Sequence, residues 1–364
     1  MKKFYMVLGS VALAAVATQP LRSQQPVAQK PAAAKRSAIP RTADGHPDLQ
    51  GFWTNVTVTP LERPANLAGK EFLSDEDAAA LEVNGNRDDN RRAAAGGRGG
   101  GAAGPGGVGD YNALWYDQGK KVLANKRTSI VTDPKDGKIP PMTPAALARI
   151  KADREYAAAH PLDGPEDLDN IERCITWISS GPPMLPTFYN NNYQIVQTPD
   201  TIAILVEMVH DVRIIPLDNR PHSDSKIRQW MGDSRGHWEG DTLVVETVNF
   251  NGKRAFLGGG RTSEGGPAPS ANPATGNGGR SGGGRTDQQM KVVERFTRTS
   301  KDTLLYQFTV TDPGTYTRPW SGEIPMQAIE GPIYEYACHE GNIAMYDILA
   351  GARKAEAEAK KSGK

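Results

Sequence analysis

Neither positive nor negative charge predominates in this sequence. Its 364 residues include 43 Lys and Arg against 42 Asp and Glu, which leaves a formal net charge of +1. Nucleic acids and anionic membranes bind proteins mainly through a positive field over the protein surface. We therefore expect neither nucleic acid nor an anionic membrane surface as a partner.

Long hydrophobic runs are also rare, since the sequence has only one. It extends from Phe4 to Ala17, follows Lys2 and Lys3, and ends in the small residues that a signal peptidase prefers. A run of about fourteen residues is too short to span a bilayer. We predict a signal peptide over residues 1–23 and a periplasmic or secreted mature chain without a membrane span. A membrane anchor is the alternative.

Cysteine occurs only twice, as Cys174 and Cys338. A pair of cysteines in an exported protein is most simply explained by a disulfide, which would close a loop of about 160 residues here. Two free thiols or a metal-binding pair are the alternatives. We predict the disulfide.

Aromatic residues make up 7% and hydrophobic residues 38% of the chain, and two segments consist largely of small residues such as Gly. Such segments cannot bury enough apolar surface to pack. We therefore expect a single core. The predicted parts are a disordered spacer (24–42), an arm (43–169) with a Gly-rich insertion (91–109), a barrel domain (170–350) with a Gly-rich loop (258–285), and a tail (351–364).

Turn residues divide the chain into short elements. In the arm, the patterns predict a strand over Gly51–Val58 and helices over Ser74–Val83 and from Thr143 to about Ala158. Glu239-Gly240-Asp241 and Ser300-Lys301-Asp302 are typical of hairpin turns. The tail is expected to form a frayed helix.

Short β-branched runs, each stopped by a turn, predict consecutive antiparallel strands in the main domain. Because a closed sheet has no exposed edges, we predict a mainly β fold, an antiparallel meander that closes into a lipocalin-like barrel of eight or nine strands. The irregular, helical N-terminal arm wraps this barrel. The strands are expected at Tyr193–Thr198, Thr201–Met208, Val212–Leu217, Gly236–Trp238, Thr242–Phe250, Met290–Thr299, Thr303–Thr311, Ser321–Ile329 and Ile333–Cys338.

Ionisable residues stand among apolar neighbours in these strands, namely Glu207, Glu246 and Arg295. If they follow the alternation of their neighbours, they point into the barrel. A barrel of this size holds its own side chains or one small ligand, so inward carboxylates imply an internal ion pair or a polar ligand. Side chains that face solvent are the alternative.

Two loops combine the side chains that acid–base catalysis needs, because a carboxylate beside a histidine fixes its tautomer and raises its basicity. We predict Glu207, His210, His222 and Asp233 as catalytic residues, with a capped surface turn as the alternative. Ser234 lacks the strand-to-helix context of a nucleophilic serine. The predicted ligand-binding residues are Arg213, Trp230, Arg235, Glu246, Arg318, Trp320, His339 and Glu340.

A metal site is not predicted, because no spacing matches a known metal motif. His210, His222 and His339 with Glu340 are the alternative in which a metal would bind. The sequence identifies no cofactor.

Several motifs together resemble a large family of exported bacterial proteins without an assigned activity. The resemblance extends over roughly residues 43–352 and implies no substrate, while the predicted barrel is loosely similar to lipocalin-like and nitrobindin-like folds. The sequence contains no haem-ligand motif. The motifs are PDLQGFW (Pro47–Trp53), ERCI (Glu172–Ile175), QIVQTPD (Gln194–Asp200), RPH (Arg220–His222), WEGDTLVVET (Trp238–Thr247), ERF (Glu294–Phe296), TRPW (Thr317–Trp320) and EYACHEGN (Glu335–Asn342).

Three functions are compatible with these features. The leading prediction is an exported barrel that binds a small, partly apolar ligand in its lumen, where Glu207, Arg213 and Arg318 orient polar groups. The second is a hydrolase, lyase or isomerase acting on a small-molecule substrate, which requires His210 or His222 to share a cavity with Arg213 or Arg318. The third is a structural or envelope partner-binding module, which requires a filled lumen and a contiguous exposed apolar patch.

Overall fold

The computed structural model describes residues 39–83, 119–160, 162–168, 170, 173–187, 190–253 and 286–363. All of them belong to one compact unit, Ser37–Lys364. The predicted signal peptide, residues 24–38 of the predicted spacer and both Gly-rich segments lie outside the described residues. Residues 40–42 of that spacer are ordered, because Thr42 N donates to His46 O and Asp48 N donates to Pro40 O, each over 2.9 Å.

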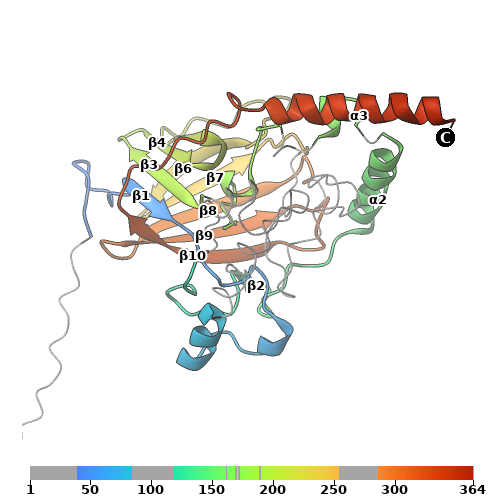
Figure 1. The fold of residues 1–364 in the computed structure, drawn as a ribbon. Coiled ribbons are helices and arrows are strands. Elements are labelled where there is room, and N and C mark those ends of the chain that lie inside the picture. The colour runs from blue at the N-terminus through green and yellow to red at the C-terminus, as the bar shows by residue number, and fades with distance from the viewer. Residues whose placement is uncertain are drawn as a thin grey trace, which may run out of the picture. The chain divides into compact units, whose positions relative to one another are not determined.

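A single antiparallel sheet of ten strands dominates the described chain, which confirms the mainly β prediction (Figure 1). The strand order is β5-β4-β3-β1-β10-β9-β8-β7-β6, and β2 pairs with β10 beside this path. The strands are β1 (Gly51–Thr54), β2 (Val131–Asp133), β3 (Asn192–Gln197), β4 (Thr201–Val206), β5 (Val212–Pro216), β6 (Asp233–Glu239), β7 (Thr242–Val248), β8 (Lys291–Arg298), β9 (Thr303–Thr311) and β10 (Trp320–Ile329).

The sheet is not closed into the predicted barrel, because β5 and β6 stand at the two ends of its strand order. These two edge strands nevertheless lie next to each other. Gly236 of β6 makes the approach close, since a Cβ atom there would lie 2.7 Å from Leu217 Cδ2 and 2.9 Å from Ile215 Cγ2. The edges therefore meet through side chains, without the main-chain ladder that would close a barrel.

Most strand and turn predictions are close to the observed bounds, and three are wrong. The predicted strand Ile333–Cys338 is an irregular segment. Its main chain bonds elsewhere, since Tyr334 N donates to Glu207 and Cys338 N donates to Tyr336 O. β1 ends at Thr54, and Asn55 N then donates to Asn191 O. Residues 233–235, predicted as a loop, open β6.

The inner face of the sheet is filled by the chain itself. Residues 177–187 cross this face, and Trp177, Met184 and Leu185 are buried on it. Tyr193 donates to Ser179 O over 3.0 Å, and the Tyr306 hydroxyl accepts from Met184 N over 2.9 Å. The largest fully buried aromatic side chains are Trp53, Tyr193, Phe250, Phe296, Tyr306, Phe308 and Trp320.

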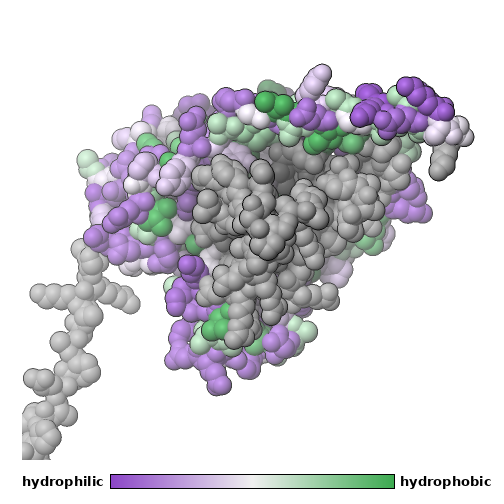
Figure 2. Space-filling view, in the orientation of Figure 1, coloured by the Kyte–Doolittle hydropathy of each residue, from purple (hydrophilic) through white to green (hydrophobic). Residues whose placement is uncertain are grey.

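Helices lie outside the sheet. α2 (Pro144–Ala159) begins as predicted, with Thr143 Oγ1 accepting from Ala146 N over 3.1 Å and proline in the first turn. A second helix starts at residue 75. The predicted frayed tail is part of a longer helix, α3 (Ile343–Ser362), whose last turns are hydrophilic (purple in Figure 2). Short 3-10 helices are η1 (Ala65–Leu67), η3 (Pro165–Asp167), η4 (Ile178–Ser180) and η5 (Met208–His210).

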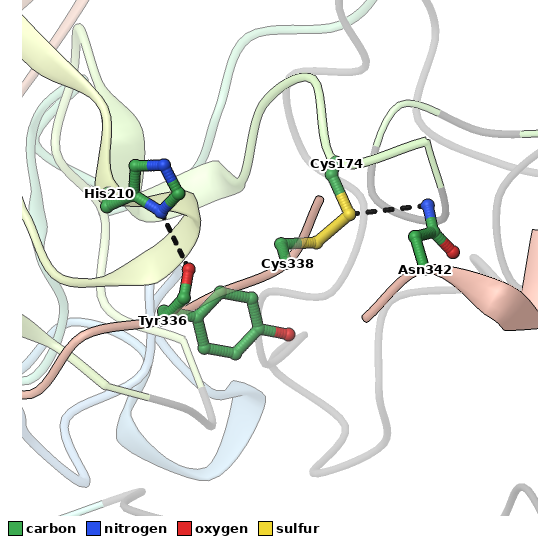
Figure 3. Close-up of a disulfide and its surroundings, with 5 residues drawn as sticks. All are labelled: Cys174, His210, Tyr336, Cys338 and Asn342. Atoms are coloured by element: carbon green, nitrogen blue, oxygen red, sulfur yellow. Dashed lines mark hydrogen bonds between the residues drawn. A yellow bond between two sulfur atoms is a disulfide. The ribbon is translucent and has the colours of Figure 1, made fainter. Parts of the chain in front are cut away.

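The predicted disulfide between Cys174 and Cys338 is confirmed, with Cα atoms 5.7 Å apart. It ties the segment that precedes η4 to the irregular segment that follows β10 (Figure 3). Within the described part of the chain, no helix combines the length and apolarity needed to cross a bilayer.

Candidate functional site

A charged cluster on the outer face of β6, β7 and β8 brings together four of the residues predicted from the sequence. Arg235 of β6 and Glu246 of β7 lie directly opposite each other in the antiparallel register. Asp233 shares the outer face with Arg235, because the two are separated by one residue along the strand. His222 reaches the same place from the connection between β5 and β6.

The imidazole of His222 stands between two carboxylates. Its Nδ1 lies 3.1 Å from Asp233 Oδ2, and its Nε2 lies 3.5 Å from Glu246 Oε1. A carboxylate oxygen only accepts, so the contact with Asp233 places the ring proton on Nδ1 when the imidazole is neutral. Nε2 then carries the lone pair and faces Glu246, and the His222 side chain as a whole is 24% exposed.

Other groups fix the two carboxylates. Asp233 also accepts from Ser223 N over 2.8 Å and from Arg235 Nη1. Arg235 in turn donates through Nε to Pro221 O over 3.1 Å. Glu246 accepts from Lys291 Nζ over 2.9 Å. The cluster is therefore held from three strands and one loop.

These contacts keep both carboxylates ionised. Burial raises the pKa of Asp233, but the Ser223 amide, His222 and Arg235 outweigh it and leave the pKa below its usual value. The hydrogen bond from Lys291 is the largest cause of the lowered pKa of Glu246, and His222 adds to it. His222 therefore lies between two ionised carboxylates, of which Asp233 is the closer.

Glu207 and His210 lie at a different place, around the turn between β4 and β5. Glu207 is 2% exposed and accepts from Asn192 Nδ2 over 2.6 Å and from Tyr334 N over 3.2 Å. His210 bonds through Nδ1 to Tyr336 O over 2.7 Å. Glu207 therefore does not orient either predicted histidine through its carboxylate, and it anchors the segment after β10.

Arg213 and Arg318 contact neither His210 nor His222 through a hydrogen bond or ion pair in the described chain. Arg213 is buried and pairs with Glu294, with Nη1 and Oε2 2.9 Å apart. Arg318 is half-exposed and pairs with Asp133 over 3.0 Å. Arg213 and Arg318 therefore do not meet the condition set above for an enzyme. Arg235, which shares Asp233 with His222, is instead the arginine beside a predicted base.

The remaining predicted ligand-binding residues are dispersed. Trp320 belongs to the core, where its ring meets Phe308 edge-on with centroids 5.6 Å apart. Trp230 is half-buried beside the start of β6. Glu340 is exposed, and His339 lies beside His210 with ring centroids 5.9 Å apart.

Glu294 is the interior carboxylate that the sequence analysis missed. On β8 the buried residues are Val292, Glu294, Phe296 and Arg298, so Arg295 faces outward and Glu246 of β7 does too. The inward placement predicted for Glu246 and Arg295 is therefore wrong. Residues two apart in a strand share a face, so the position of Phe296 would have predicted that Glu294 points into the core.

A buried polar network surrounds Glu294. Arg213 Nη1 and Nη2 both donate to Glu294 Oε1 over 3.1 Å, and the Tyr306 hydroxyl donates to the same oxygen over 2.8 Å. Burial is the main cause that raises the pKa of Tyr306 well above its usual value, and nearby Glu294 adds to it. This network ties β5 to β8 and β9 across the inner face.

Comparison with known proteins provides no match that bears on the function. The chain matches no family model, no curated protein and no solved structure. The resemblance to an exported bacterial family therefore stays a prediction. In the part of the chain that the structure describes, no three His, Cys, Asp or Glu side chains form a group that suits a metal ion.

Proposed function

We propose that the protein is an exported enzyme that uses His222 for proton transfer to and from a small polar substrate. The observation that carries this proposal is the contact between His222 Nδ1 and Asp233 Oδ2 over 3.1 Å, on a side chain that is 24% exposed. Histidine is the side chain that most often serves as general acid or base, and a hydrogen bond to its other ring nitrogen sets the tautomer. A ligand in the lumen is less well supported, since described residues fill the inner face.

Each residue of the cluster has a role in this proposal. Asp233 fixes the tautomer, so that Nε2 takes a proton from a substrate or from water and then returns it. Glu246 stabilises the imidazolium formed in between, and Lys291 holds Glu246 in place. Arg235 balances the charge of Asp233.

The reaction class follows from what the cluster contains. Ser234 is buried and its hydroxyl bonds to Thr247 over 2.8 Å, so it is turned away from His222. A reaction without a covalent enzyme intermediate fits best, in which His222 activates water or removes a proton from carbon. This comprises hydrolases, lyases and isomerases.

A substrate screen with matched variants tests the proposal. Esters, glycosides and lactones are offered to the purified mature protein, to His222→Gln and to His237→Gln. His237 is the control because its imidazole also lies beside a carboxylate, Glu239, but is half-exposed on the same strand as Asp233. We expect His222→Gln to lower turnover by about 10²–10⁴-fold and His237→Gln to leave it unchanged. Equal turnover by all three proteins would reject His222 as the base.

We also propose that the sheet behaves in solution as a closed lipocalin-like barrel. The close approach of Gly236 to Leu217 and Ile215 supports this, because it brings the two edge strands together. Closure would shield both edges from other chains. The charged cluster would then lie on the outside of the barrel wall.

A further inference from the structure

His210 occupies a strained turn. η5 follows β4, and within it Val209 has φ 63° and His210 has φ 45°. Two consecutive residues other than glycine in the left-handed region are rare, above all when one is β-branched. Surrounding contacts must therefore hold this turn, and Glu207 at its start is one of them, since its buried carboxylate bonds both the Asn192 side chain and the Tyr334 main chain.

The contact between His210 and Tyr336 defines the tautomer of the imidazole. A main-chain carbonyl only accepts, so the bond of 2.7 Å places the proton of the neutral ring on Nδ1. Nε2 keeps its lone pair. In Figure 3, Nδ1 points at the Tyr336 carbonyl and the other ring nitrogen points away from it.

A second imidazole stands beside this one. The rings of His210 and His339 have centroids 5.9 Å apart and an interplanar angle of 71°. His339 directly follows Cys338, which the disulfide to Cys174 holds in place. Both histidines are exposed, so ions from solvent reach them. Neither takes part in the His222 cluster.

From this geometry we infer that His210 and His339 together bind one late transition-metal dication, with Zn²⁺ as the representative ion. Imidazole is a preferred ligand of Zn²⁺, Cu²⁺ and Ni²⁺. A metal-binding histidine typically donates its other ring N–H to a carbonyl or carboxylate, as His210 does to Tyr336. Water completes the coordination, because the pair supplies two ligands.

The separation of the rings suits this role. Two imidazoles on one tetrahedral zinc ion have centroids about 5 Å apart, because each Zn–N bond is about 2 Å long. The observed 5.9 Å differs from this by less than the reach of a side-chain rotation. The strained turn and the disulfide hold the two main chains that carry the ligands, so little ordering is needed on binding.

Titration of the metal-free, oxidised mature protein with ZnCl2 in a calorimeter tests the inference. We expect one equivalent to bind to the wild-type protein and to His237→Gln. His210→Gln and His339→Gln should each weaken binding at least about tenfold, because the loss of a group that only supports a metal ligand already costs about 10–100-fold. CaCl2 should produce no stoichiometric heat, because Ca²⁺ prefers oxygen ligands.

The two variants also separate binding from folding. His339→Gln leaves the bond between His210 and Tyr336 in place, so its thermal midpoint without metal should equal that of the wild-type protein. NMR signals of the His210 and His339 rings should shift together as Zn²⁺ is added. An absence of stoichiometric binding, or binding that survives both substitutions, would overturn the inference.

Discussion

His222 is positioned by groups far apart in the sequence, which is why its chemistry depends on strand register. Asp233 lies at the beginning of β6 and Glu246 lies in β7, and the pairing of Arg235 with Glu246 brings the carboxylates to the same side of the sheet. A shift of one residue would turn the whole set to the other face. The site is thus a product of the β6–β7 hairpin.

Part of this site was predictable at the level of single residues. The residue types near His222 indicated acid–base chemistry, and Asp233 was one of its two candidate partners. The sequence could not show which carboxylate, Glu207 or Asp233, lies beside His222. Glu207 bonds instead to Asn192 and to Tyr334 N, and Tyr334 belongs to a segment that was predicted to be a strand. Local patterns do not reveal such long-range contacts.

Breaking the buried ion pair between Arg213 and Glu294 should destabilise the protein strongly. Glu294→Gln would leave the Arg213 charge buried without its counter-ion, so we expect the free energy of unfolding to fall by about 3–5 kcal/mol. Urea unfolding of the purified protein measures this. The control is Glu239→Gln, which removes a half-exposed pair with Arg295 at the same distance of 2.9 Å.

The control should change the unfolding midpoint little, because solvent screens an exposed pair. Equal midpoints for Glu294→Gln and Glu239→Gln would mean that the interior network does not hold β5 against β8. The comparison therefore shows whether burial of an ion pair, and not its charge alone, determines how much the pair contributes to stability.

At the scale of elements, a strand was predictable where the alternation of its residues and the turns on either side of it agreed. β9 has its predicted bounds, Thr303–Thr311, because β-branched and aromatic residues alternate between two turns. β2 has only three residues and carried no pattern. The start of β6 contains Asp233, Ser234 and Arg235, whose types favour loops, and pairing with β7 overrides that preference.

The seam between β5 and β6 requires a residue without a side chain at position 236. A Cβ atom there would lie 2.7 Å from Leu217 Cδ2, so Gly236→Ala should force the edges apart. We expect a loss of about 1–3 kcal/mol in the free energy of unfolding, the range for overpacking a core. Denaturant unfolding measures it.

Gly351→Ala is the matched control, because a Cβ atom there meets nothing within 4 Å and the residue lies inside helix α3. Alanine favours a helix over glycine by about 0.5–1 kcal/mol, so this variant should be slightly more stable than the wild-type protein. If Gly236→Ala behaved in the same way, the two edges would not be in contact.

At the scale of the whole molecule, the disulfide is the covalent link between distant parts. Cys174 and Cys338 are 164 residues apart, and most of the sheet lies between them. The pairing was predictable because only two cysteines exist. Whether the sheet closes was not predictable, since this depends on how strongly the nine strands of its main path curl.

Loss of the disulfide should lower stability by about 5 kcal/mol in the chain-entropy description, because the open chain gains many unfolded conformations. Thermal unfolding of Cys174→Ser/Cys338→Ser against the oxidised wild-type protein measures this. Addition of a reducing agent should lower the midpoint of the wild-type protein only. A double variant as stable as the oxidised protein would show that noncovalent contacts alone hold the segment after β10.

The central claim is that Asp233 orients His222 as a base, and measuring the tautomer of His222 tests it most directly. ¹⁵N NMR of the imidazole in the mature protein reports which ring nitrogen carries the proton. The account predicts a proton on Nδ1 and a free lone pair on Nε2 in the neutral ring, and it predicts that Asp233→Asn removes this preference. A neutral ring protonated on Nε2, or a tautomer unchanged in Asp233→Asn, would contradict the assignment of His222 as a base oriented by Asp233.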